Sequence, residues 1–203
     1  MNVKEVLLPF GKKIYQSEKG HGITHDTANL VEIILKNHFN EEKNVLDLGS
    51  GNGIIAIMLA WNRNKWSVLG IEIQKNLFEL ANLNKKRLNL ANVNFLNEDL
   101  NEFESDKKFD LIVINPPFFP KSSGKISPIE ERAVSRQEIK TNMEKILVSI
   151  SRNLAKTGIA YIIYPTKRLE EFSDKIKKID LIALEKKIIL QSSKTVILKL
   201  KKG

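Results

Sequence analysis

Between residues 45 and 53 the chain reads Val45-Leu46-Asp47-Leu48-Gly49-Ser50-Gly51-Asn52-Gly53, a short apolar run followed by a turn with glycine at every second position. The run 45–48 predicts a buried strand, and the apolar residues 54–61 predict a helix directly after the turn. Glycine lets the backbone turn tightly and approach a ligand that a Cβ atom would block. The N-terminus of the following helix offers free N–H groups. We therefore expect a nucleotide-like cofactor over this turn, because a plain strand–helix turn would need only one glycine.

Alternating strand and helix patterns extend outward from this turn. A helix with Asp26 as its N-cap precedes the first strand, and Gly11, Gly20 and Gly22 indicate turns before that helix. Further strands are expected at 66–73, 93–96, 109–114 and 159–164, helices at 76–90, 137–154 and 167–179, and a closing antiparallel pair at 181–190 and 195–200. Gly158 is expected to break the helix before the strand 159–164. Apolar strands that alternate with helices indicate an α/β fold, with a mainly parallel sheet and helices on both faces.

The composition is that of a basic globular chain. Its 203 residues are 42% hydrophobic and 28% charged, which excludes disordered and fibrous classes. The 33 Lys and Arg residues exceed the 24 Asp and Glu residues and give a formal net charge of +9. Such a surface attracts nucleic acid. The chain has no cysteine, so a disulfide scaffold, cysteine-ligated zinc and thiol catalysis are excluded.

No targeting or metal-binding signal is visible. The apolar runs are far shorter than the roughly 20 residues of a membrane-spanning helix. The N-terminus carries Lys4 and Glu5 and no long apolar stretch, so no secretion signal is recognised. His21, His25 and His38 lie away from the motifs described here and are given no catalytic or metal-binding role. We expect a cytoplasmic monomer without membrane or metal partners.

The charge beside the glycines narrows the choice of cofactor. Residues 51–56 fit the G-x-G-x-x-A variant of the dinucleotide fingerprint, so the glycines alone leave NAD open. The glycine run begins two residues earlier, at Gly49, and Asp47 stands just before it. A carboxylate there would repel a pyrophosphate, whereas it suits a cofactor that carries an ammonium or sulfonium charge.

Acidic side chains follow the next two strands. Ligands of open parallel sheets lie beyond the carboxyl ends of the strands, where the strand order reverses. Glu72 falls where a carboxylate can accept hydrogen bonds from both hydroxyls of an adenosine ribose. After the strand 93–96, Asp99 is the better placed of two acids to contact an adenine edge. The alternatives are a solvated carboxylate at Glu72 and a turn cap at Asp99.

Residues 115–120 read Asn-Pro-Pro-Phe-Phe-Pro and follow the fourth expected strand. The prolines exclude a helix and favour a stiff extended loop. The side-chain carbonyl of Asn115 and the backbone carbonyl of Pro116 are two fixed acceptors, since Pro117 has no N–H to compete for them. Together they can hold both hydrogens of a planar amino group and localise its lone pair as a nucleophile. Phe118 can stack on the ring that bears this group.

Together these motifs resemble class I S-adenosylmethionine-dependent methyltransferases that act on amino groups. The resemblance covers roughly residues 10–200 and is strongest to bacterial enzymes that methylate N6 of the adenine beside the anticodon of a valine tRNA. Residues 131–138 stand where those enzymes carry an Arg-rich stretch. The resemblance implies S-adenosylmethionine as cofactor and a Rossmann-like, seven-stranded, mostly parallel sheet with a C-terminal antiparallel strand. Residues 41–203 would be the methyltransferase domain, and residues 1–40 would be a segment and helix that pack on the sheet and could contact the substrate.

The resemblance also implies roles for single residues. Gly49, Gly51 and Gly53 would hold the methionine part of the cofactor, with Asp47 near its amino group. The expected cofactor-binding residues are Asp47, Gly49, Ser50, Gly51, Asn52, Gly53, Glu72, Ile73, Asp99, Leu100 and Asn115. The expected catalytic residues, which would hold the target base, are Asn115, Pro116, Pro117 and Phe118. The expected RNA-binding residues are Lys12, Lys13, Tyr15, Lys121, Lys125, Arg132 and Arg136.

The implied reaction is an in-line transfer of a methyl group from a sulfonium to the adenine amino nitrogen, without a strong general base. A stacked base is out of reach, so we expect an RNA partner, a tRNA in particular, whose target base is flipped out or already looped. Guanine-N2 methylation of rRNA and glutamine-N5 methylation of a release factor are the alternatives. Those two families usually carry a sizeable N-terminal domain, for which the 44 residues before the first strand are too few.

Two further classes remain as alternatives. A nicotinamide-dependent oxidoreductase would use residues 51–56 and Glu72, but it leaves residues 115–118 unexplained and has no evident proton donor. A non-catalytic RNA-binding module would not need the intact Asn-Pro-Pro sequence. Both therefore account for fewer of the motifs than a methyltransferase does.

Overall fold

The central sheet of the computed structural model contains seven strands in the order β5-β4-β3-β6-β7-β9-β8. Neighbouring strands from β5 to β7 are parallel, and β9 is antiparallel to both of its neighbours. The predicted α/β fold, with its mostly parallel sheet and C-terminal antiparallel strand, is thereby confirmed. The strands are β3 (Asn44–Leu48), β4 (Ser67–Ile71), β5 (Val93–Leu96), β6 (Phe109–Ile114), β7 (Leu154–Pro165), β8 (Ile182–Ile188) and β9 (Thr195–Lys201).

The structure describes residues 2–18, 24–39, 42–116, 143–176, 178–188 and 194–203, and of residues 184–188 the backbone only. The predicted turns at Gly20 and Gly22 lie outside these ranges. No helix within them is both long enough and apolar enough to cross a bilayer. In the same ranges no three His, Asp or Glu side chains form a group that could hold a metal ion.

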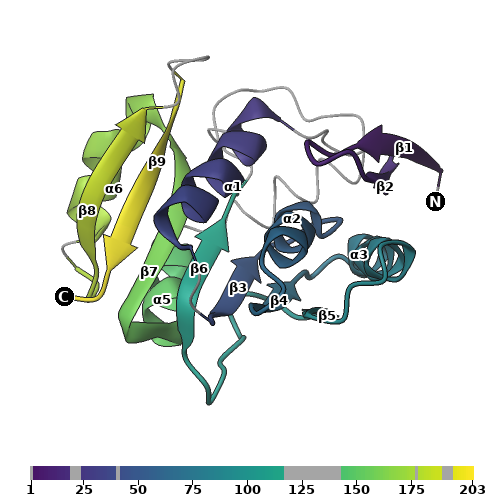
Figure 1. Cartoon of the computed structure of the whole chain (residues 1–203). Coiled ribbons are helices and arrows are strands. Elements are labelled where there is room, and N and C mark those ends of the chain that lie inside the picture. Colours follow the sequence, from purple (N-terminus) through teal and green to yellow (C-terminus); the bar gives the residue numbers. More distant parts are fainter. Residues whose placement is uncertain (1, 19–23, 40–41, 117–142, 177, 189–193) are drawn as a thin grey trace.

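Helices cover both faces of the sheet, as Figure 1 shows. The helices α1 (His25–Asn37), α2 (Ile54–Asn62) and α3 (Lys75–Arg87) pack on one face. On the other face lie α5 (Met143–Asn153) and α6 (Leu169–Ile176), which follows a short 3-10 turn, η1 (Thr166–Arg168). Successive strand residues contribute to opposite faces: Val45 is buried under α1 and α2, and Leu46 on the side of α5. This alternation explains why the parallel strands are mainly apolar on both faces.

A two-stranded antiparallel hairpin precedes α1. It consists of β1 (Val3–Leu7) and β2 (Lys13–Ser17), with Gly11 at φ 76° in the connecting turn. Leu8 and Ile14 are buried and join the core on the α1 side of the sheet. The sequence predicted turns in this segment but no hairpin.

Two local predictions are wrong. The N-cap of α1 is Thr24, whose Oγ1 accepts a hydrogen bond from the Thr27 N–H at 3.2 Å. Asp26 lies inside the first turn, where its carboxylate accepts a hydrogen bond from Thr195. Gly158 lies within β7 instead of before it, at an irregularity in the pairing with β6. A Cβ at Gly158 would stand 2.8 Å from the carbonyl oxygen of Phe109, so glycine permits the close approach of the two strands.

Candidate active site

The candidate site lies at the carboxyl edge of the parallel strands. Leu48, the last residue of β3, pairs in register with Ile71 of β4 and with Ile114 of β6. The glycine turn, Glu72 and Asn115 follow these three strands and therefore share one edge of the sheet. The chain continues from β3 to β4 and β5 on one side, and later to β6 and β7 on the other, so the strand order reverses between β3 and β6. Open α/β sheets bind their ligands at this point.

The glycine turn has left-handed backbone at each of its glycines. The φ angle is 70° at Gly49, 57° at Gly51 and 82° at Gly53, a region that residues with a Cβ rarely adopt. Two backbone hydrogen bonds hold the turn: the Ser50 N–H donates to the Ile71 carbonyl and the Gly53 N–H to the Ser50 carbonyl, each at 2.9 Å. The conformation alone therefore favours glycine at all three positions.

The surroundings of these glycines differ. A Cβ on Gly53 would stand 2.6 Å from the ring of Phe95 on β5, whereas a Cβ on Gly51 would meet no atom of the described residues within 4 Å. Packing of the turn against the sheet thus requires Gly53. Gly51, in contrast, exposes its backbone to open space, which is the arrangement predicted for a ligand that approaches the main chain.

Glu72 joins the turn to the loop after β4. It is 5% exposed, and its Oε2 accepts a hydrogen bond from the Gly51 N–H at 2.8 Å. Its Oε1 accepts one from the Gln74 N–H, also at 2.8 Å. Each carboxylate oxygen has more than one lone pair, which is the acceptor chemistry that ribose hydroxyls require. The predicted ribose carboxylate is therefore bonded directly to the predicted backbone cradle.

Asp47 lies beneath the turn and is 1% exposed. Its Oδ2 accepts a hydrogen bond from the Ala56 N–H at 3.1 Å, in the first turn of α2. Burial raises the pKa of Asp47 to about 7; the hydrogen bond from Ala56 opposes this rise, and the charge of Glu72 adds to it. A cationic group nearby would favour the ionised form. An ammonium or sulfonium group, as predicted from the sequence, would have this effect.

The loop after β5 lies against the glycine turn. Leu100 Cδ2 is 4.0 Å from the place where a Cβ on Gly49 would stand. Asp99 Oδ1 accepts hydrogen bonds from the backbone and the side-chain amide of Asn101, at 2.8 and 2.7 Å, which is the turn-cap arrangement that the sequence left open. Ile73, the other apolar residue predicted here, is 42% exposed just past the end of β4.

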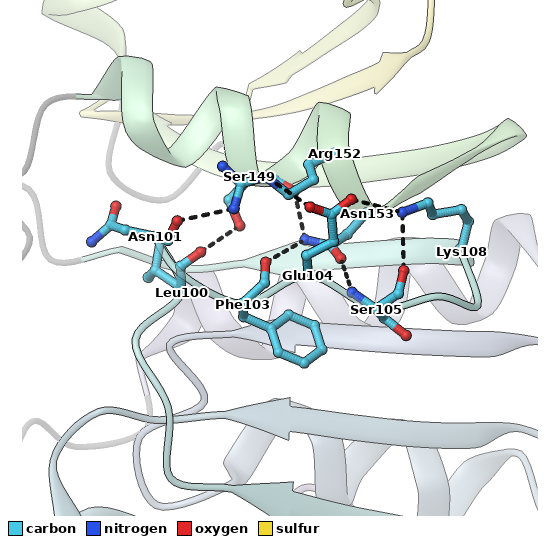
Figure 2. A network of polar contacts seen from close by, with 9 residues as sticks. All are labelled: Leu100, Asn101, Phe103, Glu104, Ser105, Lys108, Ser149, Arg152 and Asn153. Atoms are coloured by element: carbon cyan, nitrogen blue, oxygen red, sulfur yellow. Dashed lines mark hydrogen bonds and ion pairs between the residues drawn. The ribbon is translucent and has the colours of Figure 1, made fainter.

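Side chains of α5 hold this loop from the other side, as Figure 2 shows. Ser149 Oγ donates a hydrogen bond to the Leu100 carbonyl at 2.7 Å. The fully buried amide of Asn153 accepts one from the Ser105 N–H at 3.0 Å and donates one to the Phe103 carbonyl at 3.2 Å. Neither Ser149 nor Asn153 was among the predicted residues. Asn153 lies on the apolar stripe of its helix, and a polar residue at such a position is the signal that could have found it.

Asn115 follows β6, and its side-chain amide contacts α1. Nδ2 donates a hydrogen bond to Oγ1 of Thr27 at 3.1 Å, and Thr27 is 4% exposed. Because Thr27 takes the amide nitrogen, Oδ1 is the end of the side chain that can serve another group. Pro116 is buried. The other two predicted catalytic residues, Pro117 and Phe118, lie outside the described residues.

The predicted RNA-binding residues of the hairpin have contacts within the chain. Lys13 Nζ lies 3.3 Å from Glu5 Oε2, and the Arg87 guanidinium lies 4.3 Å from the centre of the Tyr15 ring. Lys12 Nζ lies 5.0 Å from the centre of an indole ring on α2. The Lys13–Glu5 pair lies within the hairpin, whereas the other two contacts connect the hairpin to α3 and α2. Contact with RNA stays a prediction. The remaining predicted RNA-binding residues lie outside the described ranges: Lys121, Lys125, Arg132 and Arg136.

A buried amide connects the hairpin to the glycine turn. Asn84 of α3 is fully buried; its Oδ1 accepts a hydrogen bond from the Tyr15 N–H at 2.7 Å. Its Nδ2 donates to the carbonyls of Tyr15 and Asn52, at 2.9 and 3.1 Å. Asn84 was not predicted, although it lies four residues after Leu80 on the apolar stripe expected for this helix. That position is the sequence signal for a buried polar contact.

The turn has the features that the predicted cofactor requires. The Gly51 backbone faces open space, and the Glu72 carboxylate lies beside it. Ser50 is 6% exposed, and its hydroxyl has no hydrogen-bond partner among the described residues. A buried hydroxyl beside an open backbone is a place where a bound ligand can supply the missing partner. The residues present therefore fit S-adenosylmethionine.

Four features together define a class I methyltransferase. They are the reversed strand order, the glycine turn, the acidic residues after β4 and β5, and the asparagine after β6. The chain belongs to the methyltransferase domain family, whose model matches residues 39–197. Both the predicted family and its cofactor, S-adenosylmethionine, are thereby confirmed. The nicotinamide-dependent alternative, which the glycine spacing alone left open, is not supported.

Two curated relatives and one solved structure illustrate the likeness. The chain is 35% identical over 132 residues to tRNA1(Val) (adenine(37)-N6)-methyltransferase of Porphyromonas gingivalis, which covers 62% of this chain and 51% of that protein. It is 40% identical over 96 residues to release factor glutamine methyltransferase of Streptococcus pneumoniae, which covers 47% of this chain and 34% of that protein. The chain thus spans about half, or less, of the length of these relatives.

Among solved structures, the fold matches a SAM-dependent methyltransferase from Thiobacillus denitrificans that was determined in complex with S-adenosyl-L-homocysteine. The TM-score is 0.64 at 16% identity, and the match covers 92% of this chain and 95% of that one. At this identity the likeness shows the fold.

Proposed function

We propose that this chain transfers a methyl group from S-adenosylmethionine to an exocyclic amino group, namely adenine N6 in a tRNA, and that the adenine beside the anticodon of a valine tRNA is the first candidate. The observation that carries the proposal is the position of Asn115. It follows β6, the strand beside the glycine turn, and the contact with Thr27 leaves its carbonyl oxygen for an amino group. The tRNA-modifying relative supports the substrate class, and the net charge of +9 supports an RNA partner. The cytoplasm is the compartment that this proposal gives to the reaction.

In this proposal the chain's own residues bind, orient and polarise. The glycine turn and Glu72 hold the cofactor at the carboxyl edge of the sheet, with the Asp47 carboxyl beneath it. Asn115 Oδ1 and the Pro116 carbonyl accept the two hydrogens of the amino group, which localises the nitrogen lone pair. S-adenosylmethionine supplies, when bound, a methyl group on a sulfonium that leaves readily. Because the nitrogen proton becomes acidic only as the nitrogen becomes cationic, the chain needs no strong base.

Residues 1–40 form the substrate-contacting part of the proposal, and 41–203 the methyltransferase domain, in a chain that acts as a monomer. Asn84 links the hairpin to the glycine turn, which supports a role for the hairpin next to the cofactor. Lys12 and Lys13 lie on this hairpin and would contribute to RNA attraction. Pro117, Phe118 and the four basic residues between 121 and 136 complete the proposed base and RNA contacts.

Asn115→Ala tests the proposed role of this residue. We expect transfer of a tritiated methyl group from S-adenosylmethionine to total tRNA to fall by about 100-fold or more, as when one preorganised hydrogen-bonding group is removed from an active site. Cofactor affinity in equilibrium dialysis should stay within about threefold, because the glycine turn and Glu72, which hold most of the cofactor in this proposal, are untouched. Asn94→Ala is the matched control. Asn94 is an exposed residue of β5, and its side chain accepts a hydrogen bond from Lys85. Equal loss of transfer and cofactor affinity would assign Asn115 a structural role and contradict the proposal.

Glutamine methylation is the second candidate. The release factor relative supports it, and a carboxamide also presents an NH2 group to two carbonyl acceptors. The tritiated-methyl transfer assay separates the two candidate functions when a release factor is supplied in place of tRNA as the acceptor of the methyl group. Our proposal expects label in the tRNA and none in the release factor.

A further inference from the structure

The first turn of α1 contains a buried threonine whose hydroxyl lies at the candidate site. Thr27 is 4% exposed, and its Oγ1 is 3.1 Å from Nδ2 of Asn115. The same Oγ1 is 3.0 Å from Oγ1 of Thr24, the N-cap residue. Thr24 Oγ1 in turn accepts a hydrogen bond from the Thr27 N–H at 3.2 Å. One hydroxyl therefore connects the cap of α1 to the residue after β6.

These hydrogen bonds form a chain with a consistent direction. An amide nitrogen can only donate, so Thr27 Oγ1 accepts the hydrogen bond from Asn115. The hydroxyl hydrogen of Thr27 is then available to Thr24 Oγ1, which acts as an acceptor toward the Thr27 N–H as well. In this arrangement one Nδ2 hydrogen of Asn115, the Thr27 hydroxyl and the Thr27 N–H each have an acceptor.

The helix that carries Thr27 is fixed independently of this contact. Asp26 accepts a hydrogen bond from Thr195 Oγ1 of β9 at 3.0 Å, and Leu30 and Ile34 are fully buried in the core. The Thr27 hydroxyl is therefore presented from a rigid position. A group held in this way can impose an orientation on its partner without ordering itself first.

An asparagine side chain offers a donor at one end and an acceptor at the other. With Nδ2 bonded to Thr27, Asn115 presents Oδ1, which suits a hydrogen-bond donor such as an amino group; the reversed amide would present N–H and oppose it. We infer that Thr27 is a positioning residue that sets the orientation of the Asn115 amide and thereby favours an amino group as the acceptor of the methyl group. This inference rests on the proposed function and adds to it a residue that determines specificity.

Two substitutions separate the hydroxyl of Thr27 from its shape. Thr27→Val removes the hydroxyl and keeps the branched side chain, whereas Thr27→Ser keeps the hydroxyl and removes the methyl group. Thr27→Ala is a second variant without the hydroxyl, for use if the valine variant does not fold. Thr195→Val is the matched control, because it removes the hydrogen bond to the neighbouring residue Asp26 in the same helical turn without touching Asn115.

The first readout is the side-chain amide resonance of Asn115 in a ¹⁵N–¹H NMR spectrum, identified by its absence from Asn115→Ala. It needs neither cofactor nor substrate. We expect Thr27→Val to shift this resonance and to speed its exchange with solvent, while Thr27→Ser and Thr195→Val leave it close to the wild-type position. An unchanged resonance in Thr27→Val would overturn the inference.

The second readout is methyl transfer to tRNA. We expect kcat of Thr27→Val to fall about tenfold, the effect of losing one hydrogen bond of ordinary strength, with the Kd for S-adenosylmethionine within about twofold. Thr27→Ser should keep kcat within about threefold of wild type. A serine variant as slow as the valine variant would indicate packing by the methyl group instead, and a wild-type kcat in Thr27→Val would also overturn the inference.

The two readouts distinguish the inference from the function on which it rests. If the wild-type chain methylates no amino group in tRNA or in a release factor, the proposed function fails. The amide resonance then decides by itself whether Thr27 orients Asn115.

Discussion

Gly51 and Gly53 have the same left-handed backbone but different neighbours, so alanine should act differently at the two positions. Gly53→Ala adds a clash with Phe95 to the backbone strain and should lower the free energy of unfolding by about 3 kcal/mol. Gly51→Ala should cost only about 1–2 kcal/mol of stability, because its Cβ enters open space. We propose that the cofactor occupies this space, so Gly51→Ala should lose more affinity for S-adenosylmethionine than Gly53→Ala does. Urea denaturation and equilibrium dialysis check the pair, and equal losses at both sites would contradict this explanation.

Asp47 should make the stability of the cofactor-free chain depend on pH. Burial raises its pKa from 3.8 to about 7, so the folded chain binds this proton more tightly than the unfolded chain does. The stability that this contributes is complete below about pH 3.8 and is lost as the pH rises through about 7. Asp47→Asn should remove this loss, so wild type should lose a few kcal/mol relative to the variant between pH 4 and pH 8.

Urea denaturation across this pH range measures the difference. Asp106→Asn on an exposed turn is the matched control and should follow wild type. The same pH dependence in wild type and Asp47→Asn would show that the buried carboxyl does not titrate as described.

Single residues could be predicted from the sequence where their chemistry is local. The glycines could be predicted because the turn needs their backbone, and Glu72 and Asn115 because each follows a recognisable strand. Thr27 could not, since its partner Asn115 lies 88 positions away and neither residue carries a signal of the other. Asp99 forms the turn cap that the sequence left as an alternative, and its contact with the cofactor stays a prediction.

At the scale of elements, the hairpin depends on one side chain of α3. Asn84→Ala removes three hydrogen bonds to the backbone of Tyr15 and Asn52 and leaves buried groups unpaired. We expect the backbone amides of β1 and β2 to exchange with deuterium about 10- to 100-fold faster, while the central sheet stays protected. Hydrogen-exchange mass spectrometry measures this directly.

Asn82→Ala is the matched control for the hairpin. Asn82 lies on the same helix, and its amide donates to the Phe78 carbonyl of that helix. It should leave hairpin exchange unchanged. If Asn84→Ala also left it unchanged, docking of the hairpin would depend on other contacts, such as the Arg87–Tyr15 pair.

The apolar periodicity of the sequence predicted the helices and strands themselves. It predicted the residues at which they begin and end less accurately. The strands β3 to β6 and the helices α2 and α3 lie close to the predicted ranges, because each buries a regular apolar pattern. The helix cap was misassigned because Asp26 is a good capping residue that is used instead to bond Thr195 of β9. The hairpin went unrecognised because Leu8 and Ile14 are buried by residues that lie far away in the sequence.

At the scale of the whole molecule, the topology brings the motifs together. The glycine turn, Glu72 and Asn115 are separated by up to 66 positions, yet they follow strands that pair in register. Because the strand order reverses between β3 and β6, the predicted cofactor residues that follow β3, β4 and β5 lie on one side of this point. Asn115, which is predicted to accept hydrogen bonds from the amino group, follows β6 on the other side. Membership of the methyltransferase domain family agrees with this arrangement. The identity of the substrate depends on contacts outside the sheet and its motifs, so the topology alone could not predict it.

The identity of the methylated nucleoside tests the central proposal most directly. Total tRNA that has been incubated with the purified chain and tritiated S-adenosylmethionine is digested to nucleosides, which are separated and identified by mass. We predict that the label is found in N6-methyladenosine and that Asn115→Ala removes it. Label in N2-methylguanosine, or label only in a release factor supplied in place of tRNA, would contradict the proposal.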